Sequence, residues 1–110
     1  MKTNLSEEQA KNLIRLGVKI SSADTETKGN VSWSLPALLN LFPCSKSSPI
    51  FELTRGGYGA DGKFDKNWLA SLEYNEVDKY YCHIAKEPID AVYKLLCEYL
   101  ENKTNNKKKK

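Results

Sequence analysis

Residues 67–85 read NWLASLEYNEVDKYYCHIA, a stretch in which apolar and polar side chains alternate. Side chains two residues apart lie on the same face of a β-strand, so the alternation predicts strands at 67–75 and 79–85. Another run of β-forming residues stands at 50–55, and the segment 56–65 after it holds four glycines and an Asp-Gly pair, as hairpin turns do. Three strands joined by short links predict an antiparallel meander.

Helical patterns flank the predicted strands. The clearest covers residues 87–102, with Pro88 at its start, Asp90 in its first turn and an apolar stripe that should cover one face of the sheet. Near the N-terminus, Ser6 and Gln9 have the spacing of a capping box and predict the start of another helix. The apolar stripe of the last helix consists of Ile89, Val92, Tyr93, Leu96 and Leu100.

A second short helix is predicted before the strands. Ser34 can cap this helix, Pro36 fits its first turn, and Pro43 ends it. The preceding segment 21–30 has few apolar residues and is expected to be an exposed connection. Because such short helices are not stable alone, we expect both N-terminal helices to pack on the sheet face that the last helix leaves open, rather than that face being exposed or used for binding.

Together these elements predict an α+β fold in the order ααβββα. Its three-stranded antiparallel β-meander is packed by a C-terminal helix, with two short N-terminal helices. A single domain is expected at 1–103, followed by a disordered lysine-rich tail at 104–110. The predicted core consists of Leu13, Ile14, Trp33, Leu38, Leu39, Phe42, Phe51, Leu53, Trp68, Ala70, Leu72, Ile84, Val92, Leu96 and Leu100.

Positive charge is concentrated at the C-terminus. The 110 residues include 17 Lys and Arg and 14 Asp and Glu, and five of the cations are lysines among the last eight residues. The preceding residues therefore hold 12 cations against 14 anions. This balance disfavours a basic nucleic-acid-binding body and leaves the tail as the candidate for binding nucleic acid or an acidic surface. The candidate residues are Lys103, Lys107, Lys108, Lys109 and Lys110.

The reactive side chains do not predict a catalytic or metal site. Three cysteines, an odd number, in a chain whose start lacks a secretory signal indicate reduced thiols in the cytoplasm. Cys82 and His83 are neighbours on a predicted strand and point to opposite faces, with His83 expected toward solvent. We therefore expect no catalytic residues, no metal and no cofactor. An enzyme built on Cys44 or Cys82 with His83 is a further alternative.

The glycine-rich segment 56–63 reads GGYGADGK and invites comparison with a phosphate-binding loop. That loop requires a Gly-Lys-Ser/Thr ending that opens a helix, whereas Lys63 precedes Phe64 and a predicted strand. A hairpin loop is therefore favoured, and exposed aromatic side chains on such a loop can contact a partner. The candidate partner-binding residues are Tyr58, Asp61, Lys63 and Phe64.

Three resemblances can be assigned to residues of this chain. The order helix, three strands, helix resembles the layout of double-stranded RNA-binding domains, but KEPIDA at 86–91 lacks the lysine pair that opens their last helix. Residues 50–100 resemble HicB-type antitoxin domains, which bind a small toxin ribonuclease, through the hairpin and the acidic-Ala pair Asp90-Ala91. Residues 5–102 resemble small uncharacterised proteins of phages and prophages of gut bacteria, through WSLPALL at 33–39 and the same pair. The last resemblance implies an origin and a fold rather than an activity.

We therefore expect a non-enzymatic accessory protein of a phage or mobile element, located in the cytoplasm of a bacterial host and acting by binding another macromolecule. An unidentified protein is the expected partner. The alternative is a nucleic-acid-associated protein that uses the lysine tail. No apolar stretch approaches the roughly 18 residues that a membrane span needs, so no membrane partner is expected. An exposed edge strand leaves room for a homodimer by strand pairing.

Overall fold

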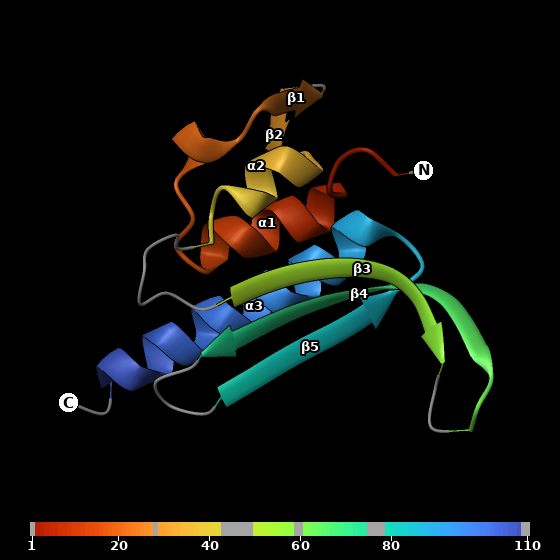
Figure 1. The fold of residues 1–110 in the computed structure, drawn as a ribbon. Helices are drawn as coiled ribbons and strands as arrows, with labels where there is room; N and C mark the ends of the chain where they lie inside the picture. The colour runs from red at the N-terminus through yellow and green to blue at the C-terminus, as the bar shows by residue number, and fades with distance from the viewer. Residues whose placement is uncertain (1, 28, 43–49, 59–60, 75–78, 109–110) are drawn as a thin grey trace.

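Three α-helices, one 3₁₀-helix and two antiparallel sheets form within the residues that the computed structural model describes (Figure 1). Those residues are 2–27, 29–42, 50–58, 61–74 and 79–108. The elements in chain order are α1 (Glu7–Arg15), η1 (Ile20–Ser22), β1 (Thr25–Thr27), β2 (Asn30–Ser32), α2 (Leu35–Leu39), β3 (Ile50–Tyr58), β4 (Phe64–Tyr74), β5 (Lys79–Ala85) and α3 (Pro88–Lys108). β1 pairs with β2, and β3, β4 and β5 form an antiparallel meander. The predicted α+β class and the three-stranded meander are confirmed.

The strands of the meander are in regular register apart from one bulge. Ala70 on β4 pairs with Leu53 on β3 and with His83 on β5. The β3–β4 register shifts after Arg55, at Gly56, whose φ of 81° is a left-handed conformation that glycine adopts without strain. Beyond this bulge the β3–β4 hairpin curves away from the rest of the sheet (Figure 1).

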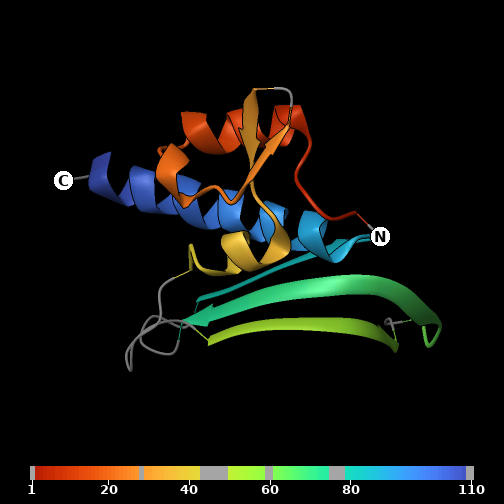
Figure 2. The same cartoon turned by 90° about the horizontal axis from the view of Figure 1, so that it is seen from above.

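All three α-helices lie on one side of the meander (Figure 2). α3 packs on β4 and β5, and α2 packs on α3. α1 is joined to α3 by polar contacts, including a 2.8 Å hydrogen bond that the Asn12 side-chain amide donates to the Tyr93 hydroxyl. The prediction that the N-terminal helices cover the remaining sheet face is wrong, because they pack on a second apolar side of α3. Leu95 and Leu96, roughly 100° apart around the helix, are both buried.

Segment 21–30, which we expected to be an exposed connection, instead carries part of η1, the strand β1 and the start of β2. The buried Trp33 donates its indole N–H to the Ser22 hydroxyl over 3.0 Å. The Asp24 carboxylate accepts hydrogen bonds from the backbone N–H and the hydroxyl of Ser34, the residue that caps α2 as predicted. Contacts with later residues therefore fold a segment whose own composition offers little to bury.

The predicted core residues are buried or half-buried, with two exceptions. Ile14 on α1 is 39% exposed and Ile84 on β5 is 51% exposed. α1 buries Ala10 and Leu13 instead of Ile14, and Ile84 lies on the sheet face away from the helices. The buried residues that the prediction missed are Leu5, Ala10, Ala37, Ile89, Ala91 and Leu95.

Helix α3 extends beyond its predicted end at residue 102 and reaches Lys108. The backbone of residues 104–108, expected to be disordered, continues the helix instead. Residues 101–108 contain neither glycine nor proline, the two residues that most disfavour a helix. In this last part the Asn102 side-chain amide also donates a 2.8 Å hydrogen bond to the Glu98 carbonyl.

Candidate functional site

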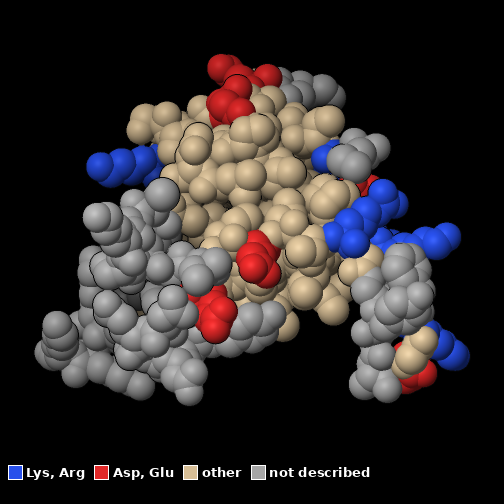
Figure 3. All heavy atoms as spheres, viewed as in Figure 1, with Lys and Arg blue, Asp and Glu red and all other residues tan. Residues whose placement is uncertain are grey.

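The meander has one face that points away from all described helices, and we call it the open face (Figure 2). Its residues alternate along the strands with inward-facing residues such as Ala70 and Leu72. They are Glu52, Thr54, Leu69, Ser71, Glu73, Cys82 and Ile84. Leu69 pairs with Thr54 on one side and with Ile84 on the other, so two adjacent apolar side chains cross β4 and β5. Figure 3 views this face and shows acidic side chains near its centre.

Cys82 and His83 point to opposite faces of β5, as predicted, but His83 does not face solvent. That expectation is wrong because the helices cover the face that carries His83, whose Nε2 lies 3.4 Å from Glu98 Oε1 on α3. Cys82 is exposed on the open face, and Cys44 lies outside the described residues. Burial raises the pKa of the half-buried Cys97 thiol, which weakens it as a nucleophile. The described fold therefore does not join Cys82 and His83 into a nucleophilic pair.

The hairpin residues predicted to bind a partner lie at the far end of β3 and β4. Tyr58 and Phe64 form the last pair of the β3–β4 register, and their side chains lie outside the described part of the structure. Asp61 and Lys63 are exposed, and the Lys63 backbone N–H donates a 3.0 Å hydrogen bond to Asp61 Oδ1. That bond closes the turn, in which Gly62 has a φ of 77°.

A basic patch that the sequence analysis missed lies where the hairpin leaves the sheet. Arg55 on β3 pairs with Trp68 on β4, which pairs with Ala85 at the end of β5. The Arg55 guanidinium carbon lies 5.6 Å from the centre of the Trp68 ring, a cation–π contact. Lys66, two residues before Trp68, and Lys86, directly after β5, are both exposed. We call Arg55, Lys66, Trp68 and Lys86 the basic patch. Predicting it from the sequence would have required the register that pairs Arg55 with Trp68, and the bulge next to this pair makes that register difficult to predict.

The end of α3 that carries three of the candidate C-terminal lysines lies far from this patch. Lys103, Lys107 and Lys108 belong to α3, although their side chains are outside the described part, and Lys109 and Lys110 are outside it entirely. Figure 1 shows the C-terminal end of α3 and the β3–β4 hairpin at opposite ends of the molecule. The described C-terminal end of α3 is therefore not adjacent to the basic patch.

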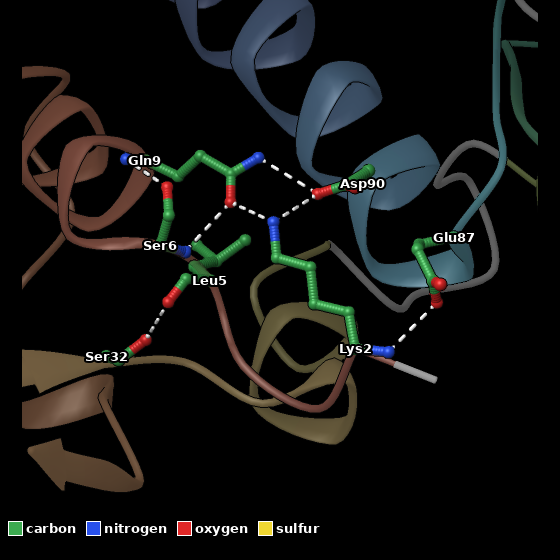
Figure 4. A network of polar contacts seen from close by, with 7 residues as sticks. All are labelled: Lys2, Leu5, Ser6, Gln9, Ser32, Glu87 and Asp90. Carbon is green, nitrogen blue, oxygen red and sulfur yellow. Dashed lines mark hydrogen bonds and ion pairs between the residues drawn. The ribbon is translucent and has the colours of Figure 1, made fainter.

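The Asp-Ala pair at the start of α3 has a structural role (Figure 4). The Asp90 carboxylate accepts hydrogen bonds from Lys2 Nζ over 2.8 Å and from Gln9 Nε2 over 3.0 Å, and Ala91 is fully buried. Burial alone would raise the pKa of Asp90, but the contacts with Gln9 and Lys2 outweigh it and hold that pKa below its ordinary value of 3.8. The Lys2 backbone N–H also donates to the Glu87 carboxylate over 3.0 Å. This network fastens the N-terminal arm and α1 to α3.

No family model, curated protein or solved structure matches this chain. Within the described ranges, no helix is both long enough and apolar enough to cross a membrane. The same residues contain no group of three or more His, Cys, Asp or Glu side chains placed to hold a metal ion. The open face and the basic patch are therefore the two surfaces from which a function can be argued.

Proposed function

We propose that this protein is a non-enzymatic accessory protein of a phage or mobile element, and that it binds a protein partner through the open face. The observation that carries the proposal is the one-sided packing of the meander, which leaves Ile84 51% exposed on the face opposite the helices. Removing exposed apolar surface from water favours association. The phage origin is supported by the sequence resemblance of residues 5–102.

The chemistry of the open face defines the partner surface that fits it. Leu69 and Ile84 provide adjacent apolar side chains on β4 and β5. Glu52 and Glu73, both exposed, lie on the same face toward the end of the sheet away from the hairpin. A complementary partner carries apolar side chains bordered on one side by Lys or Arg, because such cations would meet the two carboxylates.

A pair of matched substitutions tests the proposal. Ile84→Glu places a charge in the apolar part of the open face, whereas Ile20→Glu makes the same change at a residue of η1 that is 54% exposed and outside the sheet. Tagged wild-type protein and both variants are incubated with nuclease-treated bacterial lysate, and bound proteins are quantified by mass spectrometry. We expect one partner to be retained by the wild type and by Ile20→Glu and lost by Ile84→Glu. Equal retention by all three, or no specific partner, would contradict the proposal.

A further inference from the structure

We infer that the basic patch is a binding site for single-stranded nucleic acid, separate from the open face and from the C-terminal lysines. Arg55, Lys66 and Lys86 would contact successive phosphates, and the indole of Trp68 would stack on a base. Proteins that bind single strands without sequence preference combine these two features, a basic track for the backbone and aromatic rings for the bases.

The register places Arg55 and Trp68 side by side near the ends of the strands, and the two lysines of the patch lie close to them in the sequence. Arg55 and Ala85 flank Trp68 in one row, and Lys86 follows Ala85 directly. Neighbouring strands lie roughly 5 Å apart, so this row spans three strands, with Arg55 at its β3 end and Ala85, directly before Lys86, at its β5 end. Lys66 lies on β4 two residues before Trp68, at the bulge, where Lys66 and Asn67 together lie opposite Gly56.

The patch is accessible because the hairpin extends past the start of α3 (Figure 2). Arg55, Lys66 and Lys86 are exposed, and Trp68 is half-buried and packs against the core, so only part of its indole is accessible to a ligand. Figure 3 shows basic side chains gathered on the hairpin side of the molecule. Asp61 lies at the hairpin turn, beyond the patch. Two acidic residues are direct sequence neighbours of patch lysines: Asp65 precedes Lys66, and Glu87, which accepts a hydrogen bond from the Lys2 backbone N–H, follows Lys86.

The indole ring favours nucleic acid over an acidic protein segment. An acidic protein segment would interact with the three cations alone. A nucleic-acid base can also stack on the indole of Trp68 or on the planar guanidinium of Arg55, which lies 5.6 Å from the centre of that ring. Exposed lysines elsewhere, such as Lys11 and Lys19, have no aromatic partner in the described contacts. The combination of ring and cations distinguishes the patch from ordinary surface charge.

The test uses the full-length protein and a dye-labelled oligothymidylate of about 12 nucleotides, a length comparable to the roughly 4–16 nucleotides that one single-strand-binding OB fold covers. Affinity is measured by fluorescence anisotropy at several salt concentrations, and stacking is measured by tryptophan fluorescence. Trp33 is fully buried, so quenching on binding reports Trp68. In Trp68→Phe the quenching should disappear while anisotropy still detects binding.

The double variant Arg55→Ala/Lys86→Ala is compared with Lys11→Ala/Lys19→Ala, which removes the same charge from exposed residues outside the sheet. We expect the first to weaken binding at least about tenfold and to lower the slope of log affinity against log salt by about 1.4, since each phosphate contact contributes roughly 0.7. The control should leave both nearly unchanged.

Three results would overturn the inference. Binding without tryptophan quenching would remove the stacking role of Trp68. Binding that is lost when Lys107–Lys110 are replaced by glutamine, but kept in Arg55→Ala/Lys86→Ala, would assign it to the C-terminus. Polyglutamate that binds as tightly as the oligonucleotide and depends on the same cations would indicate an acidic protein as the ligand.

Discussion

Replacing Leu95 by alanine is expected to destabilise the protein far more than the same change at Ile84. Leu95 is fully buried on α3, a helix that packs on β4 and β5 and also on α2. Leu→Ala at such a site costs about 2–5 kcal/mol, because the lost transfer free energy adds to the energy of the cavity. Ile84 is 51% exposed, so its truncation removes only part of a burial worth about 1.5–3 kcal/mol and should cost about 1 kcal/mol or less.

Urea unfolding followed by circular dichroism measures both changes. A small domain has a total free energy of unfolding of about 5–15 kcal/mol, so Leu95→Ala should move the midpoint strongly while Ile84→Ala moves it slightly. The two variants together test whether α3 packs against both the meander and the N-terminal helices, and whether the meander has helices on one face only. Equal losses at the two positions, or a larger loss at Ile84, would refute that packing.

Three further predictions concern single side chains. The contacts that hold the pKa of Asp90 below 3.8 stabilise the fold above that pH and are lost as the pH falls through the lowered value. The difference in free energy of unfolding between wild type and Asp90→Asn, measured in urea, should therefore shrink on acidification. An increase in this difference on acidification would contradict the prediction. Iodoacetamide should modify Cys82 before Cys97 in a peptide-mapping time course, since burial raises the pKa of the Cys97 thiol; faster reaction at Cys97 would oppose the assigned burial. Ser34→Ala should lower the free energy of unfolding by about 1 kcal/mol through loss of the α2 cap, whereas Ser21→Ala should have little effect, and equal effects would argue against the cap.

Local signals in the sequence were sufficient for the elements whose structure depends on neighbouring residues. The Ser6–Gln9 capping box forms as its spacing predicts, and Ser34 caps α2. Alternation correctly separated Cys82 from His83 on β5. Alternation alone defines two faces of a strand without showing which one is covered, and for that reason Ile84 was wrongly placed in the core.

The remaining features depend on contacts between distant residues. The β1–β2 hairpin is held by contacts such as the hydrogen bonds from Ser34 to Asp24, which no local pattern indicates. The basic patch requires the register that sets Arg55 opposite Trp68, next to a bulge whose position was not evident from the glycines alone. Candidate binding residues far apart in the chain therefore became visible only in the folded molecule.

Photo-cross-linking from Cys82 tests directly whether a protein partner binds to the open face. A cysteine-directed photo-cross-linker is attached to Cys82 in a Cys44→Ser background, and a control carries it on Ser21→Cys in a Cys44→Ser/Cys82→Ser background. Cys82 is exposed on the open face, on the edge strand β5, whereas Ser21 is exposed on η1. We predict that illumination in lysate joins the partner to the probe at Cys82 and not to the probe at position 21. Cross-linking from position 21 alone, or equally from both positions, would contradict binding through the open face.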